Sequence, residues 1–343
     1  MGFRKNRWEL NSPLFVERAG FCRILTNLHL SKKRFFYIQY KLMNTLLDSI
    51  GNTPLVEIKK LNPNPNVKIL AKLEGFNPAG SMKDRVALAL IEDAEKTGLL
   101  TKDKTIIEIT NGNTGVGIAM VAAVKGYKAI IVAPETVNED RCRVITSFGA
   151  KIILVKPEMW RQGAIDMVNK MVANDPSLVV LNQFANKENC LANYRATGKE
   201  IISQVNGPID YFISCIGTGA TISGIARQLK DHDPQARVVG IQPRIWGSGS
   251  SIETNVDLPV AAATIPCVDR ANVLVDSIVE VGEKEAAEMA RRITLEEGIF
   301  AGISSGAAMI VAQHYAQKIG KGTIVTIFPD RGETYLATEI FKS

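Results

Sequence analysis

The sequence has few of the residues that build disulfide scaffolds, metal centres and hydrolase triads. It holds five cysteines in 343 residues, an odd number, and none of them has CxxC spacing. This pattern is typical of a reducing compartment and argues against a disulfide framework or a zinc site. The three histidines (His29, His232 and His314) are scattered, so no metal cluster or Ser-His-Asp pattern is predicted. We therefore expect a cytoplasmic protein without a metal.

Long apolar runs are also missing, and residues 43–343 carry no excess of basic side chains. No stretch reaches the roughly 18 apolar residues of a membrane helix. The net charge is +6, but residues 1–42 hold nine of the 41 basic side chains and two of the 35 acidic ones. The rest of the chain then carries 32 basic and 33 acidic side chains. A nearly neutral body offers no basic groove, so neither nucleic acid nor a membrane is a predicted partner.

Residues 1–42 differ in composition from everything that follows. They are basic, aromatic-rich around Phe35-Phe36-Tyr37, and lack a signal-peptide core. An organelle transit peptide is one interpretation. A leader or mis-started segment, with Met43 as the working start, is the other and the favoured one. In both cases we expect this basic N-terminal extension to lie outside the fold.

From Met43 onward, strand patterns and helix patterns alternate. The expected strands are 67–74, 105–109, 129–133, 151–155, 178–181, 211–216, 237–241 and 323–328. The expected helices are 86–98, 116–124, 139–148, 161–173, 193–204, 222–230, 284–297 and 306–318. This alternation predicts an α/β fold of parallel sheets covered by helices. The irregular segment 243–272 is a candidate lid or interface.

One stretch, Asn77-Pro-Ala-Gly-Ser-Met-Lys-Asp-Arg85, joins an expected strand to an expected helix. Ser81 is a plausible N-cap, which places Lys83 in the first helical turn. The helix dipole disfavours a cation there and should lower the pKa of Lys83. A neutral amine can form a Schiff base with a carbonyl cofactor. An arbitrary lysine would more often be a solvated partner of Asp84 or Glu74.

Three glycine-rich loops lie between an expected strand and the start of an expected helix, where backbone N–H groups bind anions. The loop 110–115 (Thr-Asn-Gly-Asn-Thr-Gly) would suit a carboxylate. The loop 217–221 (Gly-Thr-Gly-Ala-Thr) would make a phosphate cup, although it lacks the Gly-Lys-Ser/Thr ending of a nucleotide P-loop. The loop 301–306 alone is only a serine-capped helix start.

A rival interpretation sees a dinucleotide loop in Gly115-Val116-Gly117, with Glu135 about twenty residues further on. Met120 stands where the third glycine or an alanine should be. This signal is weak.

Taken together, these segments resemble the cysteine synthase (O-acetylserine sulfhydrylase) family of fold-type-II pyridoxal-phosphate enzymes. The resemblance runs from Ile50-Gly-Asn-Thr-Pro-Leu55 to Asp330-Arg-Gly-Glu-Thr-Tyr-Leu336. Glu297-Gly-Ile-Phe300 and the Ser304-Ser-Gly306 loop look most like cysteine synthase B. The resemblance implies a tryptophan synthase β-like fold, with two parallel-sheet α/β domains and the cofactor between them. Residues 43–86 and 195–343 would form the larger, cofactor-binding domain and 87–194 the smaller, mobile one; family members are usually homodimers.

The resemblance also implies a role for each matching position. Lys83 would hold the cofactor and act as the catalytic base, and Ser304 would face the pyridine nitrogen. The residues implied to bind the cofactor are Lys83, Asn113, Gly217, Thr218, Gly219, Ala220, Thr221 and Ser304. The residues implied to bind the substrate are Thr110, Asn111, Gly112, Thr114 and Gln183.

The implied reaction is a ping-pong β-replacement on pyridoxal 5'-phosphate. O-acetyl-L-serine loses its acetate to leave an aminoacrylate, and sulfide adds to give L-cysteine. Open alternatives are another activated serine such as O-phosphoserine, an amine nucleophile as in diaminopropionate-forming synthases, a nucleotide-binding oxidoreductase, and a catalytically idle homologue.

Several positions depart from the family pattern. Asn193-Tyr194-Arg195 stands where many members have His-Tyr, and Pro329 replaces the cysteine of type B enzymes. Residues 252–258 lack the arginines of type B enzymes, and 260–263 replace the usual Gly-Ile-Gly. These changes predict that sulfide serves well as the sulfur donor and thiosulfate poorly.

Overall fold

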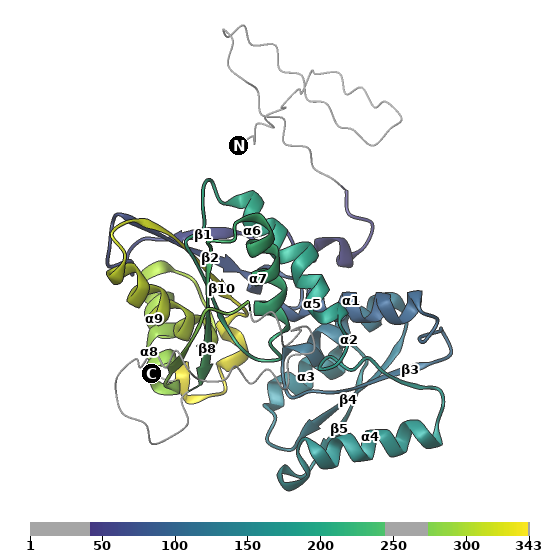
Figure 1. Cartoon of the computed structure of the whole chain (residues 1–343). Coiled ribbons are helices and arrows are strands. Elements are labelled where there is room, and N and C mark those ends of the chain that lie inside the picture. Colours follow the sequence, from purple (N-terminus) through teal and green to yellow (C-terminus); the bar gives the residue numbers. More distant parts are fainter. Residues whose placement is uncertain (1–41, 244–273, 342–343) are drawn as a thin grey trace, which may run out of the picture. The chain divides into compact units, whose positions relative to one another are not determined.

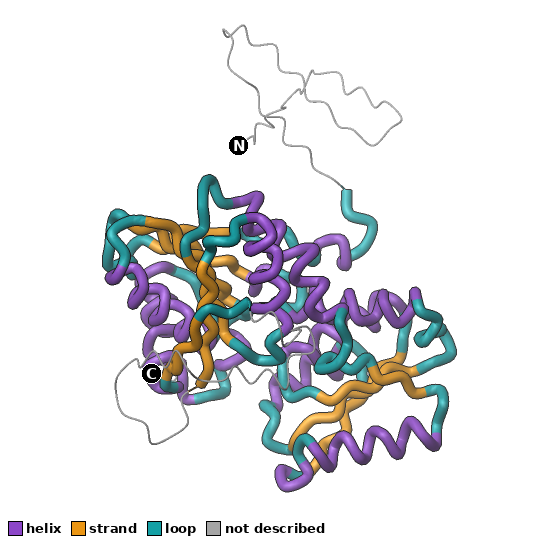
Figure 2. The backbone as a smooth tube through the Cα atoms, viewed as in Figure 1, coloured by secondary structure: helices purple, strands orange, loops and turns teal. Residues whose placement is uncertain are grey.

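The computed structural model describes residues 42–243 and 274–341, and Met43–Ser343 form one unit. The N-terminal extension and most of the expected lid, 243–272, therefore lie outside the described residues. The described strands form two separate sheets (Figure 2), one of six strands and one of four. This arrangement confirms the predicted α/β fold.

The larger sheet has the order β1-β2-β10-β7-β8-β9. Its neighbours are parallel except for β1, which runs antiparallel to β2. The strands are β1 Leu55–Ile58, β2 Val67–Leu73, β7 Tyr211–Cys215, β8 Arg237–Pro243, β9 Ser277–Val281 and β10 Gly322–Phe328. The sequence predicted the parallel core of this sheet but not β9 or the direction of β1.

The smaller sheet has the order β5-β4-β3-β6, and all its neighbours are parallel. Its strands are β3 Thr105–Ile109, β4 Lys128–Pro134, β5 Lys151–Val155 and β6 Leu178–Val180. These strands fall within the range 87–194 that the sequence assigned to a smaller domain. The division of the chain into a larger and a mobile smaller domain stays a prediction.

Helices cover both faces of each sheet (Figure 1). On β10, Ile324 and Phe328 pack toward α8 (Glu283–Arg292) and α9 (Ile303–Lys318). On its other face, Val325 and Ile327 pack toward α6 (Lys199–Gln204) and α7 (Ala220–His232). In the smaller sheet, Ile106 shares a core with α1 (Lys83–Lys96) and α2 (Asn113–Lys125), and its neighbour Ile107 shares one with α4 (Gln162–Asn174). Successive strand residues point to opposite faces, so a strand buried on both faces must be apolar throughout.

Most of the helices begin closer to the preceding strand than predicted, whereas α3 begins at the predicted residue and α4 one residue after it. Their bounds are α1 Lys83–Lys96, α2 Asn113–Lys125, α3 Glu139–Ser147, α4 Gln162–Asn174, α5 Glu188–Ala192, α6 Lys199–Gln204, α7 Ala220–His232, α8 Glu283–Arg292 and α9 Ile303–Lys318. A π-helical turn, Asn193–Gly198, joins α5 to α6, and another, Ile293–Glu297, extends α8. Each of the helices α2, α7 and α9 starts two or three residues before its predicted position, directly after a glycine N-cap. Polar residues expected in loops therefore lie in first helical turns.

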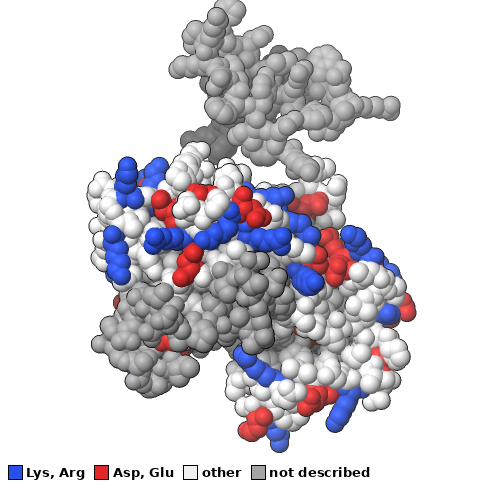
Figure 3. Space-filling model, viewed as in Figure 1, with Lys and Arg blue, Asp and Glu red and all other residues white. Residues whose placement is uncertain are grey.

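Basic and acidic side chains are interspersed on the face of the described surface that Figure 3 shows. This mixture matches the near-neutral charge of the chain after residue 42. In the described ranges, no helix combines the length and apolar character that crossing a membrane requires.

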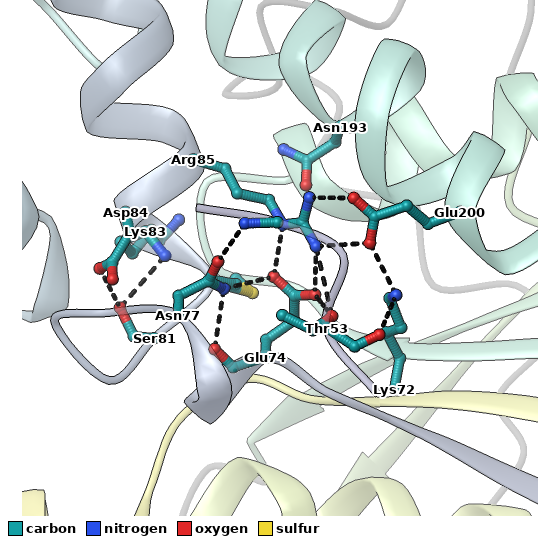
Figure 4. A network of polar contacts seen from close by, with 12 residues as sticks. Thr53, Lys72, Glu74, Asn77, Ser81, Lys83, Asp84, Arg85, Asn193 and Glu200 are labelled. Atoms are coloured by element: carbon teal, nitrogen blue, oxygen red, sulfur yellow. Dashed lines mark hydrogen bonds and ion pairs between the residues drawn. The ribbon is translucent and has the colours of Figure 1, made fainter. Parts of the chain in front are cut away.

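Buried charges fix the start of α1 against the larger sheet (Figure 4). The guanidinium of Arg85 donates to Glu74 at 2.7 and 2.8 Å and to Glu200 at 2.6 and 2.8 Å. Lys72, which is fully buried on β2, donates to Glu200 at 2.7 Å and to Thr53 O and Gln204 Oε1. Burial acts to raise the pKa of Glu200, but Arg85 and Lys72 lower it to about 2. The carboxylate of Glu200 therefore stays ionised across the physiological pH range.

We expect Lys72→Met to lower the free energy of unfolding by about 3 kcal/mol, because it removes one charge from a buried ionic network. Glu200 keeps Arg85 as a partner, which holds the loss near the lower end for broken buried pairs. Urea denaturation measures the change. Lys68→Met is the matched control: Lys68 is exposed on the same strand, and its loss should cost less than about 0.5 kcal/mol. Equal losses in the two variants would contradict the importance of this network.

Candidate active site

A cavity of about 600 Å³ lies where several strands end. It is lined by residues that follow directly on β3, β7 and β10, and by Lys83 and Ser304 at the starts of α1 and α9. In parallel α/β sheets, ligands bind beyond the carboxyl ends of the strands, because helix N-termini and loops converge there. This cavity is therefore the candidate active site.

Lys83 lines the cavity and is the first residue of α1. Surrounding protein desolvates its ammonium group and lowers the pKa of Lys83 to about 8. The lowered pKa agrees with the prediction, although burial is the cause here and the prediction invoked the helix dipole. No described ion pair includes Lys83. A larger fraction of this amine is therefore neutral at neutral pH than for an exposed lysine, although the protonated form still predominates.

The turn before Lys83 is fixed by short polar contacts (Figure 4). Lys83 N donates to Ser81 Oγ at 3.1 Å, and Ala79 N donates to the buried carboxylate of Asp84 at 2.6 Å. Met82 N donates to Pro329 O at 2.9 Å, which ties the turn to the end of β10. Met82 is the N-cap in place of the predicted Ser81, but the Ser81 hydroxyl still accepts a first-turn N–H group.

The loop between β7 and α7 offers N–H groups to an anion. Gly217, Thr218, Gly219 and Thr221 line the cavity, whereas Ala220 is buried behind them. Gly219 has a φ of +79° and forms the N-cap of α7, a conformation that favours glycine. A Cβ added at Gly217 would meet no atom of the described residues within 4 Å, so this backbone borders open space within the described part of the chain. The first-turn N–H groups of a helix lack internal partners and bind phosphate well.

Ser304 lies in the first turn of α9 and lines the same cavity. Cys215, at the end of β7, donates its thiol to Ser304 O at 3.4 Å. Burial raises the pKa of Cys215 to about 12, so this thiol stays protonated. The structure thus places two neutral groups beside the cavity at this point.

Asp330 and Tyr335 are cavity residues that the sequence analysis did not assign to the site. Asp330 Oδ2 accepts Asn113 Nδ2 at 2.7 Å and the Tyr335 hydroxyl at 2.9 Å. Burial raises the pKa of Asp330, and the two hydrogen bonds oppose that shift. The signal in the sequence was an aspartate two residues after the end of a buried strand, within the matching segment 330–336.

The expected substrate residues fall into two groups. Asn111, Gly112 and also Asn113 line the cavity. Thr110, Thr114 and Gln183 are buried behind that surface, and Thr114 Oγ1 donates to Gln183 Oε1 at 2.8 Å. The structure therefore connects Gln183, on a different loop, with the first turn of α2.

The dinucleotide interpretation of Gly115-Val116-Gly117 is wrong. Both glycines lie inside α2, not in a loop. A Cβ at Gly115 would come within 3.1 Å of Ile131 and Thr110, and one at Gly117 within 3.1 Å of Lys83 O. These glycines are needed for close helix packing, and Gly117 lets α2 approach the backbone of Lys83.

The chain is similar to known proteins in both sequence and structure. The model of the family "Pyridoxal-phosphate dependent enzyme" matches residues 46–330. Cysteine synthase B of Pseudomonas aeruginosa is 40% identical over 297 residues, 87% of this chain and 97% of that protein. The crystal structure of a cysteine synthase from Entamoeba histolytica aligns with a TM-score of 0.79 and 33% identity, over 91% of this chain and 94% of that one. The crystal structure of an O-ureido-L-serine synthase also aligns with a TM-score of 0.79 and 33% identity, over 88% of this chain and 96% of that one.

Fold and cavity together define a fold-type-II pyridoxal-phosphate enzyme. The chain belongs to the cysteine synthase family within the pyridoxal-phosphate dependent enzymes. The residues fit the cofactor: an amine with a lowered pKa, an open N–H cradle at Gly217 for a phosphate, and a neutral hydroxyl at Ser304 border one cavity.

Proposed function

We propose that this enzyme makes L-cysteine from O-acetyl-L-serine and sulfide by β-replacement. The observation that carries the proposal is the Lys83 amine, whose pKa burial lowers to about 8, in a cavity that is also lined by the glycine-rich loop 217–221 and by Ser304. When bound, pyridoxal phosphate withdraws electrons from the attached amino acid, so that its Cα proton becomes acidic and a group on Cβ can leave.

Residues of four elements would hold the cofactor. Lys83 Nζ would bind its carbonyl carbon, and the loop from Gly217 to Thr221 at the start of α7 would bind its phosphate. Ser304 would face the ring nitrogen and Asn113 the ring hydroxyl. Because the Ser304 hydroxyl is neutral, it does not force a proton onto that nitrogen. This weakens the electron withdrawal and favours loss of a Cβ group over transamination.

Lys83 Nζ would also move the proton in the reaction. A base works best when its pKa lies near the working pH, and a pKa of about 8 meets that condition. We infer that Nζ takes the Cα proton of the substrate and returns a proton when the new amino acid forms.

The first turn of α2 would bind the substrate carboxylate. Asn111 and Gly112 line the cavity just before the helix, and the N–H groups of its first turn lack helical partners. The helix dipole adds positive potential at this end. Thr110, Thr114 and Gln183 lie directly behind this turn and would complete the site.

A donor and nucleophile screen tests the function. Enzyme loaded with pyridoxal phosphate should release L-cysteine from O-acetyl-L-serine and sulfide, and should use O-phosphoserine more slowly. The similarity to an O-ureido-L-serine synthase justifies adding amine and hydroxylamine-type nucleophiles to the screen. Turnover with an amine but not with sulfide would replace the proposed function by the diaminopropionate-type alternative.

We expect kcat/KM for sulfide to exceed that for thiosulfate by at least about tenfold, a difference of about 1.4 kcal/mol. Thiosulfate is a larger dianion, and among the described residues that line the cavity Lys83 is basic while Glu283 and Asp330 are acidic. Arg331 is exposed and pairs with Glu333, so it does not supply a cavity charge. An uncharged thiol such as 2-mercaptoethanol controls for size alone. Comparable kcat/KM values for sulfide and thiosulfate would refute this prediction.

We further infer a cytoplasmic homodimer whose residues 87–194 move to close over the substrate. The free thiols of Cys142 and Cys215 support a reducing compartment. The family resemblance supports the dimer and the closing movement. Light scattering on the purified protein measures the oligomeric state, and a monomer would exclude the dimer.

A further inference from the structure

Glu108 is a carboxylate buried in the smaller sheet, below the loop that precedes α2. It is the penultimate residue of β3 and only 2% exposed. None of the ion pairs of the described residues includes it. Burial raises the pKa of Glu108 to about 7, and backbone N–H groups oppose the shift. A buried carboxylate without a cation is costly, so its presence calls for a specific contact.

That contact is with the chain that follows β6. Glu108 Oε2 accepts Asn182 N at 2.8 Å, and Oε1 accepts Gln183 N at 3.4 Å. Asn182 has a φ of +55°, a left-handed conformation that few side chains adopt without support. The two oxygens of Glu108 therefore hold the turn that carries Gln183.

Gln183 is held at every other polar atom as well. Its carbonyl oxygen accepts Asn189 Nδ2 at 2.8 Å, and its Nε2 donates to Ile109 O at 3.3 Å. Its Oε1 accepts the hydroxyl of Thr114, a residue of the first turn of α2. Its second Nε2 hydrogen has no hydrogen-bond acceptor among the described residues. A continuous chain of hydrogen bonds thus runs from Glu108 through Gln183 to the start of α2.

We propose that Glu108 is a positioning residue for the carboxylate of the amino acid substrate. It acts through Gln183, whose backbone it fixes and whose side chain orients Thr114 at the carboxylate-binding end of α2. This inference rests on the proposed function, because that function assigns the substrate carboxylate to this helix start.

A carboxylate is suited to this task because each of its oxygens accepts one of two adjacent N–H groups. A glutamine at 108 has one acceptor oxygen, and its NH2 group would face an N–H donor. Glutamine therefore keeps the volume of the side chain but can accept only one of the two backbone hydrogen bonds. The lost hydrogen bond would first change the position of Gln183 and, through it, that of Thr114.

The test is a double-mutant cycle of Glu108→Gln and Gln183→Ala in the full chain loaded with pyridoxal phosphate. L-serine, which lacks an activated leaving group, is the binding probe, and its dissociation constant is read from the visible absorbance of the cofactor. We expect Glu108→Gln to raise that constant and the KM for O-acetyl-L-serine roughly tenfold, with kcat within about twofold. The double variant should bind L-serine no more weakly than the weaker-binding of the two single variants, because both substitutions act through the same contact.

Two further variants keep the test decisive. Glu95→Gln is the matched control: Glu95 also accepts two hydrogen bonds, from Lys125 and Tyr127, but far along α1 from the loop. It should leave KM unchanged. Glu108→Asp keeps the charge and should give a smaller rise in KM than Glu108→Gln. It takes the place of Glu108→Gln in the test if that variant does not fold.

Additive effects in the cycle, or a Glu108→Gln variant that loses thermal stability with unchanged L-serine affinity, would overturn the inference alone. A wild-type enzyme that neither binds L-serine nor turns over O-acetyl-L-serine would overturn the proposed function and the inference with it.

Discussion

Lys83→Ala should lose at least about a thousandfold in turnover, because general-base catalysis alone contributes 10²–10⁴-fold. The same change removes the amine that would attach the cofactor, so bound pyridoxal phosphate should lose its visible absorbance band. The fold should persist, since the Lys83 side chain takes no part in the described ion pairs and only its backbone supports the turn. Steady-state turnover, absorbance and circular dichroism measure the three effects.

Lys96→Ala is the control for Lys83→Ala, because Lys96 is an exposed lysine at the far end of α1. It should retain full activity.

The pH dependence of cofactor uptake gives a second check on Lys83. With a pKa of about 8, the neutral fraction of the amine rises from about 10% at pH 7 to about 90% at pH 9. Cofactor uptake by the cofactor-free protein should accelerate accordingly, and uptake independent of pH in this range would contradict the lowered pKa.

Gly217→Val should weaken pyridoxal-phosphate binding at least about a hundredfold while leaving the cofactor-free protein as stable as before. A Cβ at Gly217 meets no atom within 4 Å in residues 42–243 and 274–341, and this glycine is not among those with positive φ. The added side chain therefore enters only the cavity, where it would displace the phosphate from N–H groups whose charge-assisted bonds contribute about 1.5–3 kcal/mol each. Cofactor titration and thermal denaturation measure the two effects.

Gly320→Val is the matched control for Gly217→Val. Gly320 also has open space around its Cα, but it is exposed between α9 and β10 and away from the cavity. Its substitution should change neither cofactor affinity nor stability by much. If Gly217→Val binds the cofactor as the wild type does, the phosphate lies elsewhere and the assignment of this loop is wrong.

The loops could be located from the sequence because each carries local signals. Pro78 and Gly80 mark the turn before Lys83, and the glycines at 217 and 219 follow an apolar strand directly. Such turn residues act through their own backbone conformation, so they are informative without any knowledge of distant contacts. The sequence predicts the starts of α2, α7 and α9 two or three residues too late, because a glycine N-cap gives no side-chain signal.

Residues whose role depends on partners far away in the sequence carry no local turn or periodicity pattern that would identify them. Asp330 is joined to Asn113 across 217 positions, and Glu108 to Asn182 across 74. Read alone, each is an acidic residue in or after a strand. The raised pKa of each follows from burial, which the chain acquires only when the sheets and helices pack.

The sequence by itself predicted the α/β class and located the candidate lysine and the candidate phosphate loop, because periodicity and turn residues act over a few neighbouring positions. The chemistry came from the family resemblance, which rests on matching motifs such as those at 77–85 and 110–115. The tertiary structure alone decided that burial lowers the pKa of Lys83, that Gly115 and Gly117 serve helix packing, and that Glu108 supports Gln183. The physical reason is that desolvation, close packing and long-range hydrogen bonds depend on which segments meet in space, and local sequence patterns do not encode those meetings.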